Sequence, residues 1–217
     1  MATVIDLSHP FGDGTVTYPG LPAPVVGAHL SREDSRARYA PGYEFHIGRI
    51  DMVANTGTYL DTPFHRYADG HDLAGLDLAR VVDVPGILVD ATAVQGAGAD
   101  LLDGLDLAGR AVLFHTGWDR HWATDAYGDG THPFVAVDAA ERLVAAGASV
   151  VGIDSVNIDD TRTGERPIHS ILLAAGIPIV EHLRGLGQLA GTAFRFTAAP
   201  PAVVGMGTFP VRAYAVV

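Results

Sequence analysis

The chain has 217 residues, a formal net charge of −11, 48% hydrophobic residues and a mean hydropathy of +0.21. Such a chain can bury a substantial core, and we expect one domain that spans residues 1–217. Its acidic balance, with no basic cluster, argues against nucleic acid as a partner. Because cysteine is absent, any bound metal must be held by His, Asp or Glu side chains.

Neither a targeting segment nor a membrane span is apparent. Residues 1–7 lack a basic region followed by a long apolar run, and no stretch approaches the ~18 uninterrupted apolar residues of a membrane-spanning helix. We therefore expect a soluble, cytoplasmic protein that does not contact membranes. A small molecule is the expected substrate.

The first predicted element is a short strand at residues 4–7. Residues 31–38 are strongly charged, which is typical of a solvated helix or loop and less often of a lid over a site. Residues 45–53 alternate apolar with mixed residues, which predicts a half-buried strand that leads directly to Asn55.

The middle of the chain predicts two interior strands and a helix. Residues 81–91 and 111–114 are apolar and β-branched, and the glycine-rich segment 95–99 between them reads as a surface loop. Asp138 has the pattern of an N-cap followed by Glu141, and Gly147 is a plausible C-terminal stop. The spacing predicts a helix between Asp138 and Gly147.

Helix and strand units then repeat, which indicates an α/β fold. A strand is expected at 149–154, a helix at 168–175 and a strand at 177–181, and a closing strand at 209–217 carries Pro210, which favours a sheet edge. Asp154 and Glu181 follow buried strands, where ligands gather in α/β sheets. Both are site candidates.

The most informative stretch is residues 55–65, which reads as an active-site loop. Gly57 permits backbone angles that a side chain forbids, and Pro63 sets its own φ and pushes Thr62 towards an extended conformation. Asp61 and His65 should therefore leave the backbone in defined directions, which suits a metal ligand or a proton-transfer group.

Three candidate ligands, Asp61, His169 and Glu181, lie at the ends of different predicted elements, where a fold can gather them around one divalent ion. Spacing alone leaves an alternative open, in which His169 caps a helix or bonds a carbonyl and Glu181 is an exposed strand-end charge. His65 is a candidate general acid or base, because imidazole exchanges protons near neutrality; it could instead pack on the surface. Residues 115–122, with both tryptophans, either wall a pocket or form a packed corner.

The loop resembles the signature His-x-Gly-Thr-His-x-Asp-x-Pro-x-His of the cyclase family, which includes kynurenine formamidase and isatin hydrolase. The resemblance covers nearly the whole chain in order. The further matching blocks are residues 5–10, 18–20, 151–154, 169–173 and 177–181.

The resemblance implies a mixed β-barrel-like sheet with flanking helices, in a homodimer or larger assembly. It also implies a metal-dependent hydrolase of amides, typically with zinc or manganese. Carried over by position, Asp61 resembles the metal-bridging aspartate, His65 the acid/base histidine, and His169 and Glu181 the downstream metal ligands.

Two positions depart from the signature. Its first and second histidines, metal ligands in the family, fall on Asn55 and Tyr59, whose oxygens are weak donors. A two-metal centre is therefore not expected. We predict a single zinc or manganese ion held by Asp61, His169 and Glu181, with Asn55 and Tyr59 contacting substrate. His46 is expected to be a core or second-layer residue rather than a ligand.

The sequence thus predicts a hydrolase in which bound water attacks an amide, lactam or ester carbonyl while His65 moves protons. Because Asn55 and Tyr59 replace two ligands, one alternative is a relative that has lost catalysis and serves as a small-molecule-binding protein. A second alternative is a metal-free cyclase or dehydratase in which Tyr59 and His65 act as acid and base.

Overall fold

A computed structural model describes residues 2–217, which form a nine-stranded mixed sheet with a small number of helices. The four central strands, β5 (Val84–Asp90), β7 (Ala111–His115), β9 (Val150–Ile153) and β10 (Ile179–Glu181), run parallel, and the outer strands join antiparallel. In sheet order the strands are β1 (Val4–Asp6), β13 (Tyr214–Val216), β11 (Arg195–Thr197), β5 (Val84–Asp90), β7 (Ala111–His115), β9 (Val150–Ile153), β10 (Ile179–Glu181), β4 (Tyr59–Asp61) and β12 (Thr208–Pro210). The predicted α/β class, with a mixed, β-barrel-like sheet and flanking helices, is confirmed.

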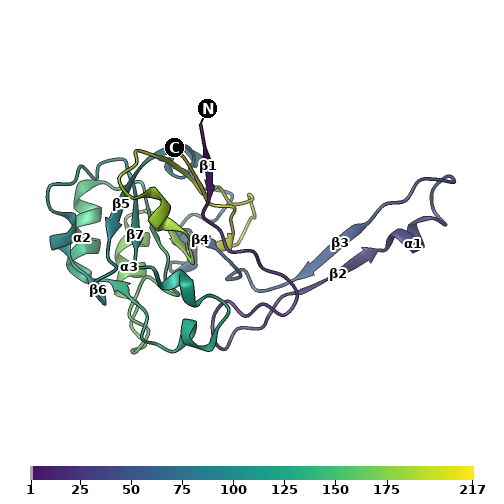
Figure 1. Ribbon diagram of the computed structural model, residues 1–217, viewed down its shortest axis with the longest axis horizontal. Coiled ribbons are helices and arrows are strands. Elements are labelled where there is room, and N and C mark those ends of the chain that lie inside the picture. The colour runs from purple at the N-terminus through teal and green to yellow at the C-terminus, as the bar shows by residue number, and fades with distance from the viewer. Residues whose placement is uncertain (1) are drawn as a thin grey trace.

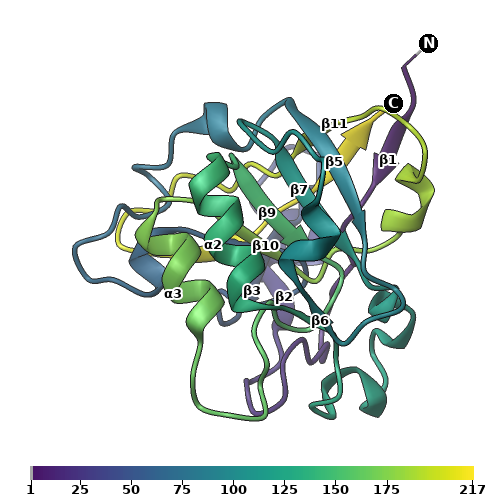
Figure 2. The ribbon, with the colours of Figure 1, turned by 90° about the vertical axis from the view of Figure 1, so that its left-hand side faces the viewer.

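Two helices, α2 (Val137–Ala146) and α3 (Pro167–Ala174), lie over one face of the central strands (Figure 2). Alternate side chains of the parallel strands point to opposite faces of the sheet, so each strand contributes side chains to two hydrophobic cores. Val112 and Phe114 of β7 pack under the helices, whereas Ala111 and Leu113 pack with residues of the outer strands on the other face. Burial on both faces explains why these strands are continuous apolar runs.

The predicted helix begins two residues earlier than expected from an N-cap at Asp138. Ala136 is the N-cap, and the Asp138 carboxylate accepts the N–H of Ala139 at 2.8 Å inside the first turn. The predicted end is confirmed, since Gly147 adopts φ 74° and its N–H donates to the last turn. A left-handed angle of this kind is accessible to glycine at no steric cost.

Two further expectations change in detail. The predicted surface loop 95–99 contains a short strand, β6 (Gly96–Ala97), which pairs in parallel with β8 (Phe134–Val135) and buries Ala97. The single closing strand is two strands, β12 and β13. Pro210 ends β12 at one edge of the large sheet, as its missing N–H favours.

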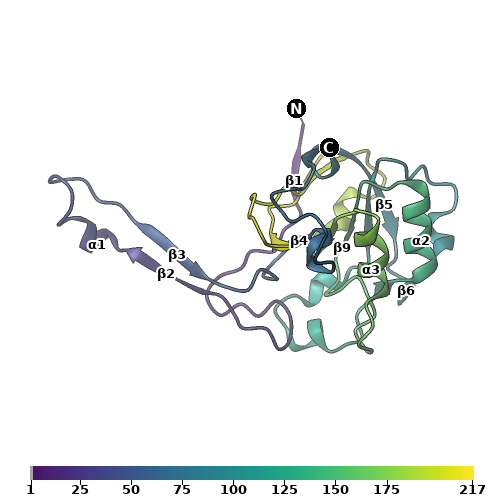
Figure 3. The ribbon, with the colours of Figure 1, turned by 180° about the vertical axis from the view of Figure 1, so that it is seen from behind.

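The strands β2 (Val25–Leu30) and β3 (Ile47–Asp51) form a separate antiparallel ribbon with the short helix α1 (Arg32–Ser35) near its tip. We call residues 25–51 the arm; it projects far from the body of the molecule (Figures 1 and 3). The charged helix is exposed, as predicted. The half-buried strand predicted at 45–53 is instead exposed along its length, and His46 is an exposed arm residue rather than part of a core.

Short 3-10 helices make most of the remaining connections, at Pro63–His65, Leu78–Arg80, Ala99–Leu102, Trp118–His121, Asp125–Gly128 and Leu186–Leu189. Among residues 2–217, every helix is too short or too polar to cross a bilayer.

Candidate active site

Strand β4 places two of its residues directly opposite site residues on the neighbouring strands. It lies between β10 and β12, where Tyr59 faces Glu181 across one pairing and Asp61 faces Thr208 across the other. Residues directly opposite each other in an antiparallel pair share a face, so their side chains meet. All four side chains are nearly or fully buried.

His65 lies on the 3-10 helix that follows β4. Thr62 is extended, with φ −104° and ψ 167°, and Gly57 has φ 67°, so both residues adopt the backbone conformations predicted from Pro63 and from glycine. The turn brings the His65 ring back over the strand end, with its Nδ1 3.6 Å from Asp61 Oδ1. The His65 side chain is 35% exposed.

His169 lies in the first turn of α3 and is held by Asp159. That carboxylate accepts the N–H of Ile168 at 2.6 Å and the N–H of His169 at 3.1 Å, and it also bonds the ring Nδ1 of His169 at 2.6 Å. One buried aspartate therefore caps the helix and orients the ring. The other ring nitrogen, Nε2, is left free to bind a metal, an arrangement common among metal-ligating histidines.

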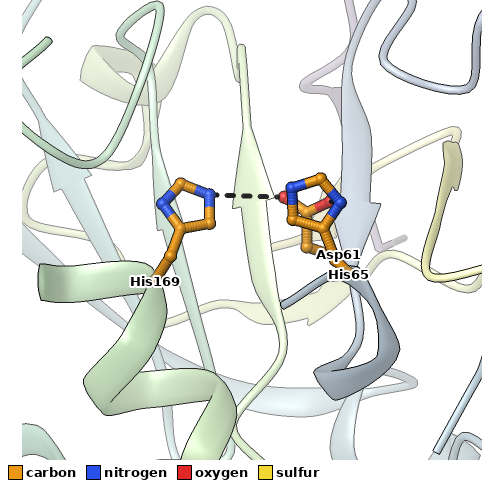
Figure 4. Close-up of side chains that lie close together, drawn as sticks. All are labelled: Asp61, His65 and His169. Atoms are coloured by element: carbon orange, nitrogen blue, oxygen red, sulfur yellow. Dashed lines mark ion pairs between the residues drawn. The ribbon is translucent and has the colours of Figure 1, made fainter. Parts of the chain in front are cut away.

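The structure places two of the predicted ligands, Asp61 and Glu181, near the third, His169. His169 Nε2 lies 3.7 Å from Asp61 Oδ2 and 3.7 Å from Glu181 Oε1 (Figure 4 shows the first pair). His65 joins the cluster, since ligand atoms of Asp61, His65 and His169 lie within 4.8 Å of one another. A cavity of about 290 Å³ opens onto these groups and is lined by Tyr18, Leu21, Asn55, Tyr59, His65, Arg66, Asn157, Arg166, His169 and Glu181.

A buried chain of hydrogen bonds leads away from Glu181. The Tyr59 hydroxyl donates to Glu181 Oε2 at 2.7 Å and lies 3.3 Å from His182 Nε2, while His182 Nδ1 bonds the Tyr127 hydroxyl at 2.8 Å. Burial lowers the pKa of His182 to about 3, so this ring is neutral. The sequence reasoning missed His182 and Tyr127, because neither lies in a recognisable pattern.

Thr208 connects Asp61 to His65 and was also missed. Its hydroxyl donates its only proton to Asp61 Oδ1 in a short hydrogen bond, so it must accept a proton from His65 Nδ1, which lies at 2.8 Å. This direction places the hydrogen of the neutral His65 ring on Nδ1 and leaves a lone pair on Nε2. A lone pair on a half-exposed ring is the requirement for a general base.

The charges in the cluster depend on one another. Burial lowers the pKa of His169, but the surrounding carboxylates, led by Glu181, outweigh burial and raise it to about 10. Burial raises the pKa of Glu181 to about 7, although His169 opposes the rise. Burial also raises the pKa of Asp61, but His65 and His169 reverse the effect and hold it below its ordinary value.

Asp61 and His169 fit a divalent ion, and His65 is the third group with a ligand atom within 4.8 Å of theirs, whereas Glu181 lies outside that group. Asp61 Oδ2 is buried and has no hydrogen-bond partner within residues 2–217, which is costly for a carboxylate oxygen unless a cation neutralises it. Ligand atoms ~2.1 Å from a tetrahedral ion lie ~3.4 Å apart, close to the spacing from His169 Nε2 to both carboxylates. The carboxylates whose negative charge raises the pKa of His169 are the groups whose charge a bound cation would neutralise.

Two other sequence candidates lie outside the cluster. Asp154 is buried but accepts the N–H groups of Thr116 and Gly117, at 2.6 Å and 3.0 Å, so it organises a loop. In the aromatic segment 115–122, Trp122 stacks on His9 with ring centroids 4.1 Å apart. Asp119 and Trp122 line a separate cavity of about 470 Å³ and not the 290 Å³ cavity, so the segment both packs and walls a pocket away from the cluster.

The sequence matches a known family across most of its length. The Cyclase family model, described as a putative cyclase, matches residues 5–160. Because that match covers more than half of the chain, the chain belongs to this family. It is also 27% identical to a kynurenine formamidase of Bacillus cereus over 210 residues, covering 96% of this chain and 95% of that protein.

Solved structures agree with this assignment. A structure described as a potential metal-dependent hydrolase with cyclase activity superimposes with a TM-score of 0.78 at 29% identity, covering 100% of both chains. An isatin hydrolase bound to the product analogue thioisatinate superimposes with a TM-score of 0.83 at 23% identity, covering 100% of this chain and 92% of the other. The second likeness supports the fold.

Proposed function

We propose that this chain is a metal-dependent hydrolase of small-molecule amides, in which one divalent ion is held by Asp61, His169 and Glu181. The observation that carries this proposal is the buried Asp61 Oδ2, which accepts no hydrogen bond and lies 3.7 Å from His169 Nε2. A divalent ion between such a carboxylate oxygen and an imidazole nitrogen would replace the proton that the ring holds. Zinc and manganese both accept this donor set.

A bound divalent ion supplies Lewis acidity towards a carbonyl oxygen and makes water more acidic. His65 Nε2 receives a proton from the attacking water and returns it to the leaving nitrogen, so that water is added across the C–N bond. Thr208 holds His65 in the tautomer that this step requires, and Asp159 holds the ring of His169. Asn55 and Tyr59 also line the cavity, where we propose that they contact the substrate.

Kynurenine formamidases are among the curated relatives, so an aryl formamide is the first substrate class to test. Formanilide is a suitable probe, because its hydrolysis releases formate and aniline. His65→Ala should abolish turnover of formanilide while the metal content stays unchanged, whereas Asp61→Ala should remove the metal. Full activity in His65→Ala would overturn the proposed role of this residue.

The same pair of variants separates the alternatives. A binding protein without catalysis would hold ligand but release no aniline in the unsubstituted chain. A metal-free cyclase or dehydratase needs Tyr59 to lose its proton, but burial and the charges of Glu181 and Asp61 raise the Tyr59 pKa well above its ordinary value. That shift favours the metal-dependent reading.

We further propose that the arm docks on a second copy of this chain. Val26 pairs with Ile50 and Ala28 with Gly48, so one face of the ribbon is apolar, with Val26 46% and Ile50 53% exposed. A two-stranded ribbon is marginally stable alone and needs a covering surface. The arm carries four Arg and four Asp or Glu, 4 − 4 = 0, so it approaches another acidic body without charge repulsion.

Reciprocal arms in a two-fold dimer bury two such faces. Sedimentation analysis should show a dimer for the unsubstituted chain and a monomer for the double variant Val26→Glu, Ile50→Glu. Val204→Glu, at a position 83% exposed outside the arm, is the matched control and should remain dimeric. A monomeric unsubstituted chain, or a dimeric double variant, would refute the proposal.

A further inference from the structure

The positively charged side chains of this acidic chain differ in whether they form ion pairs. All fourteen are arginines, and within residues 2–217 seven of them pair with carboxylates, namely Arg36, Arg110, Arg142, Arg162, Arg184, Arg195 and Arg212. The arginines that line the 290 Å³ cavity, Arg66 and Arg166, are not among them. The acidic residue that lines the same cavity, Glu181, is already held by Tyr59 and by the N–H of Ile158.

Ser170 brings these two arginines together. Arg66 Nε donates to Ser170 Oγ at 3.2 Å, and Ser170 Oγ donates to the carbonyl of Arg166 at 2.8 Å. The Arg166 guanidinium is braced through Nη1, which donates to the carbonyls of Thr163 at 2.8 Å and Glu165 at 2.6 Å. Both cations are therefore anchored by one edge only.

The remaining N–H groups have no acceptor in the described chain. These are Nη1 and Nη2 of Arg66, and Nε and Nη2 of Arg166. A guanidinium offers parallel N–H groups whose spacing matches the two oxygens of a carboxylate. Two guanidinium groups with unbonded N–H groups, both lining one cavity, form a binding site for an anion.

The two arginines are also placed next to the reacting groups. Arg66 directly follows His65, and Arg166 lies three residues before His169 on the turn that enters α3. Tyr18 and Leu21 line the same cavity and add an apolar wall. A ligand held by the arginines would extend along this wall towards His65 and His169.

We propose that Arg66 and Arg166 form a carboxylate-binding subsite, so that the substrate is a small amide with an apolar body and a carboxylate group. The inference rests on the proposed hydrolase function for the reacting end of the substrate. Hydrogen bonds to a charged group contribute more than hydrogen bonds to a neutral one, so the charged substrate is favoured at least about tenfold.

The test compares formanilide with 2-formamidobenzoate, which differ by one carboxylate. In the unsubstituted enzyme, kcat/KM for 2-formamidobenzoate should exceed that for formanilide at least about tenfold. In the double variant Arg66→Gln, Arg166→Gln this ratio should fall to about one, mainly through KM. The ratio is internal to each protein, so a general loss of activity cancels.

Arg120→Gln is the matched control, because Arg120 also holds a carbonyl, that of Gly117 at 2.7 Å, and does not line the cavity. It should keep the full ratio. A ratio near one in the unsubstituted enzyme, or a ratio that survives in the double variant, would overturn the subsite; the second result would place the carboxylate on the metal instead.

The experiments distinguish a failure of the hydrolase proposal from a failure of the carboxylate-binding subsite. If neither formamide is hydrolysed, the proposed function is wrong, and calorimetry with benzoate and benzamide then tests the subsite alone. Benzoate should bind at least about tenfold more tightly than benzamide, and the double variant should lose this difference. Equal binding of the two probes, or an undiminished preference in the double variant, would refute the subsite.

Discussion

Replacing Tyr59 with phenylalanine tests the buried hydrogen-bond chain behind the cluster, because it removes one oxygen and leaves the ring in place. Two partners lose their contacts, Glu181 Oε2 at 2.7 Å and His182 Nε2 at 3.3 Å, and both belong to residues at most 1% exposed. A hydrogen bond to a charged group contributes about 1.5–3 kcal/mol and a neutral one about 1 kcal/mol. The expected loss of unfolding free energy is therefore about 3 kcal/mol.

For a chain of this length, each 1 kcal/mol shifts Tm by about 2–4 °C, so Tyr59→Phe should lower Tm by about 6–12 °C. Thermal unfolding followed by circular dichroism, on chelator-treated protein so that ion binding does not contribute, measures the change. Tyr67→Phe is the matched control, since its hydroxyl donates to the carbonyl of Ser170 at 2.9 Å in a partly buried setting. Equal Tm losses in the two variants would show that the Tyr59 hydroxyl does not support Glu181.

Two further predictions concern proton placement. Thr208→Val should lower kcat about tenfold or more with unchanged metal content, because His65 then loses the partner that sets its tautomer; Thr208→Ser should restore turnover, and a fully active valine variant would contradict this role. His9 has a pKa lowered to about 4, chiefly by burial, against about 6.5 in the unfolded chain, so its contribution to stability is present above pH 6.5 and is lost as the pH falls towards 4. His9→Phe, which retains an aromatic ring against Trp122, should therefore lose less Tm than the unsubstituted chain between pH 6.5 and 4, and parallel Tm profiles would refute this linkage.

Local patterns predicted the elements whose environment is set by their own residues. The parallel strands were visible because burial on both faces requires continuous apolar runs, as in residues 111–114. The prediction of a half-buried strand in the arm was wrong. Alternation of apolar and mixed residues in 45–53 shows that the two faces of a strand differ in polarity, but it does not show what covers either face. Only the register of β2 with β3, and the absence of a third strand on this ribbon within residues 2–217, reveal that the arm is uncovered.

The site residues likewise divide into those that the sequence predicted and those that only the fold reveals. Asp61 and His65 were found because glycine and proline in one loop constrain where side chains point. His169 and Glu181 were candidates because they lie at the ends of predicted elements, and the family resemblance supported them as metal ligands. Thr208 was invisible, because it meets Asp61 across 147 residues through the pairing of β12 with β4. Asp159 is a similar case: an aspartate ten residues before a histidine carries no signal until the turn into α3 brings the two together.

The proposed chemistry depends on an ion at Asp61, His169 and Glu181, and metal analysis tests this most directly. Protein purified without chelator should contain about one zinc or manganese per chain by elemental analysis. The Asp61→Ala variant, prepared in parallel, should contain almost none. A metal-free unsubstituted chain, or an Asp61→Ala variant that keeps its ion, would contradict the account.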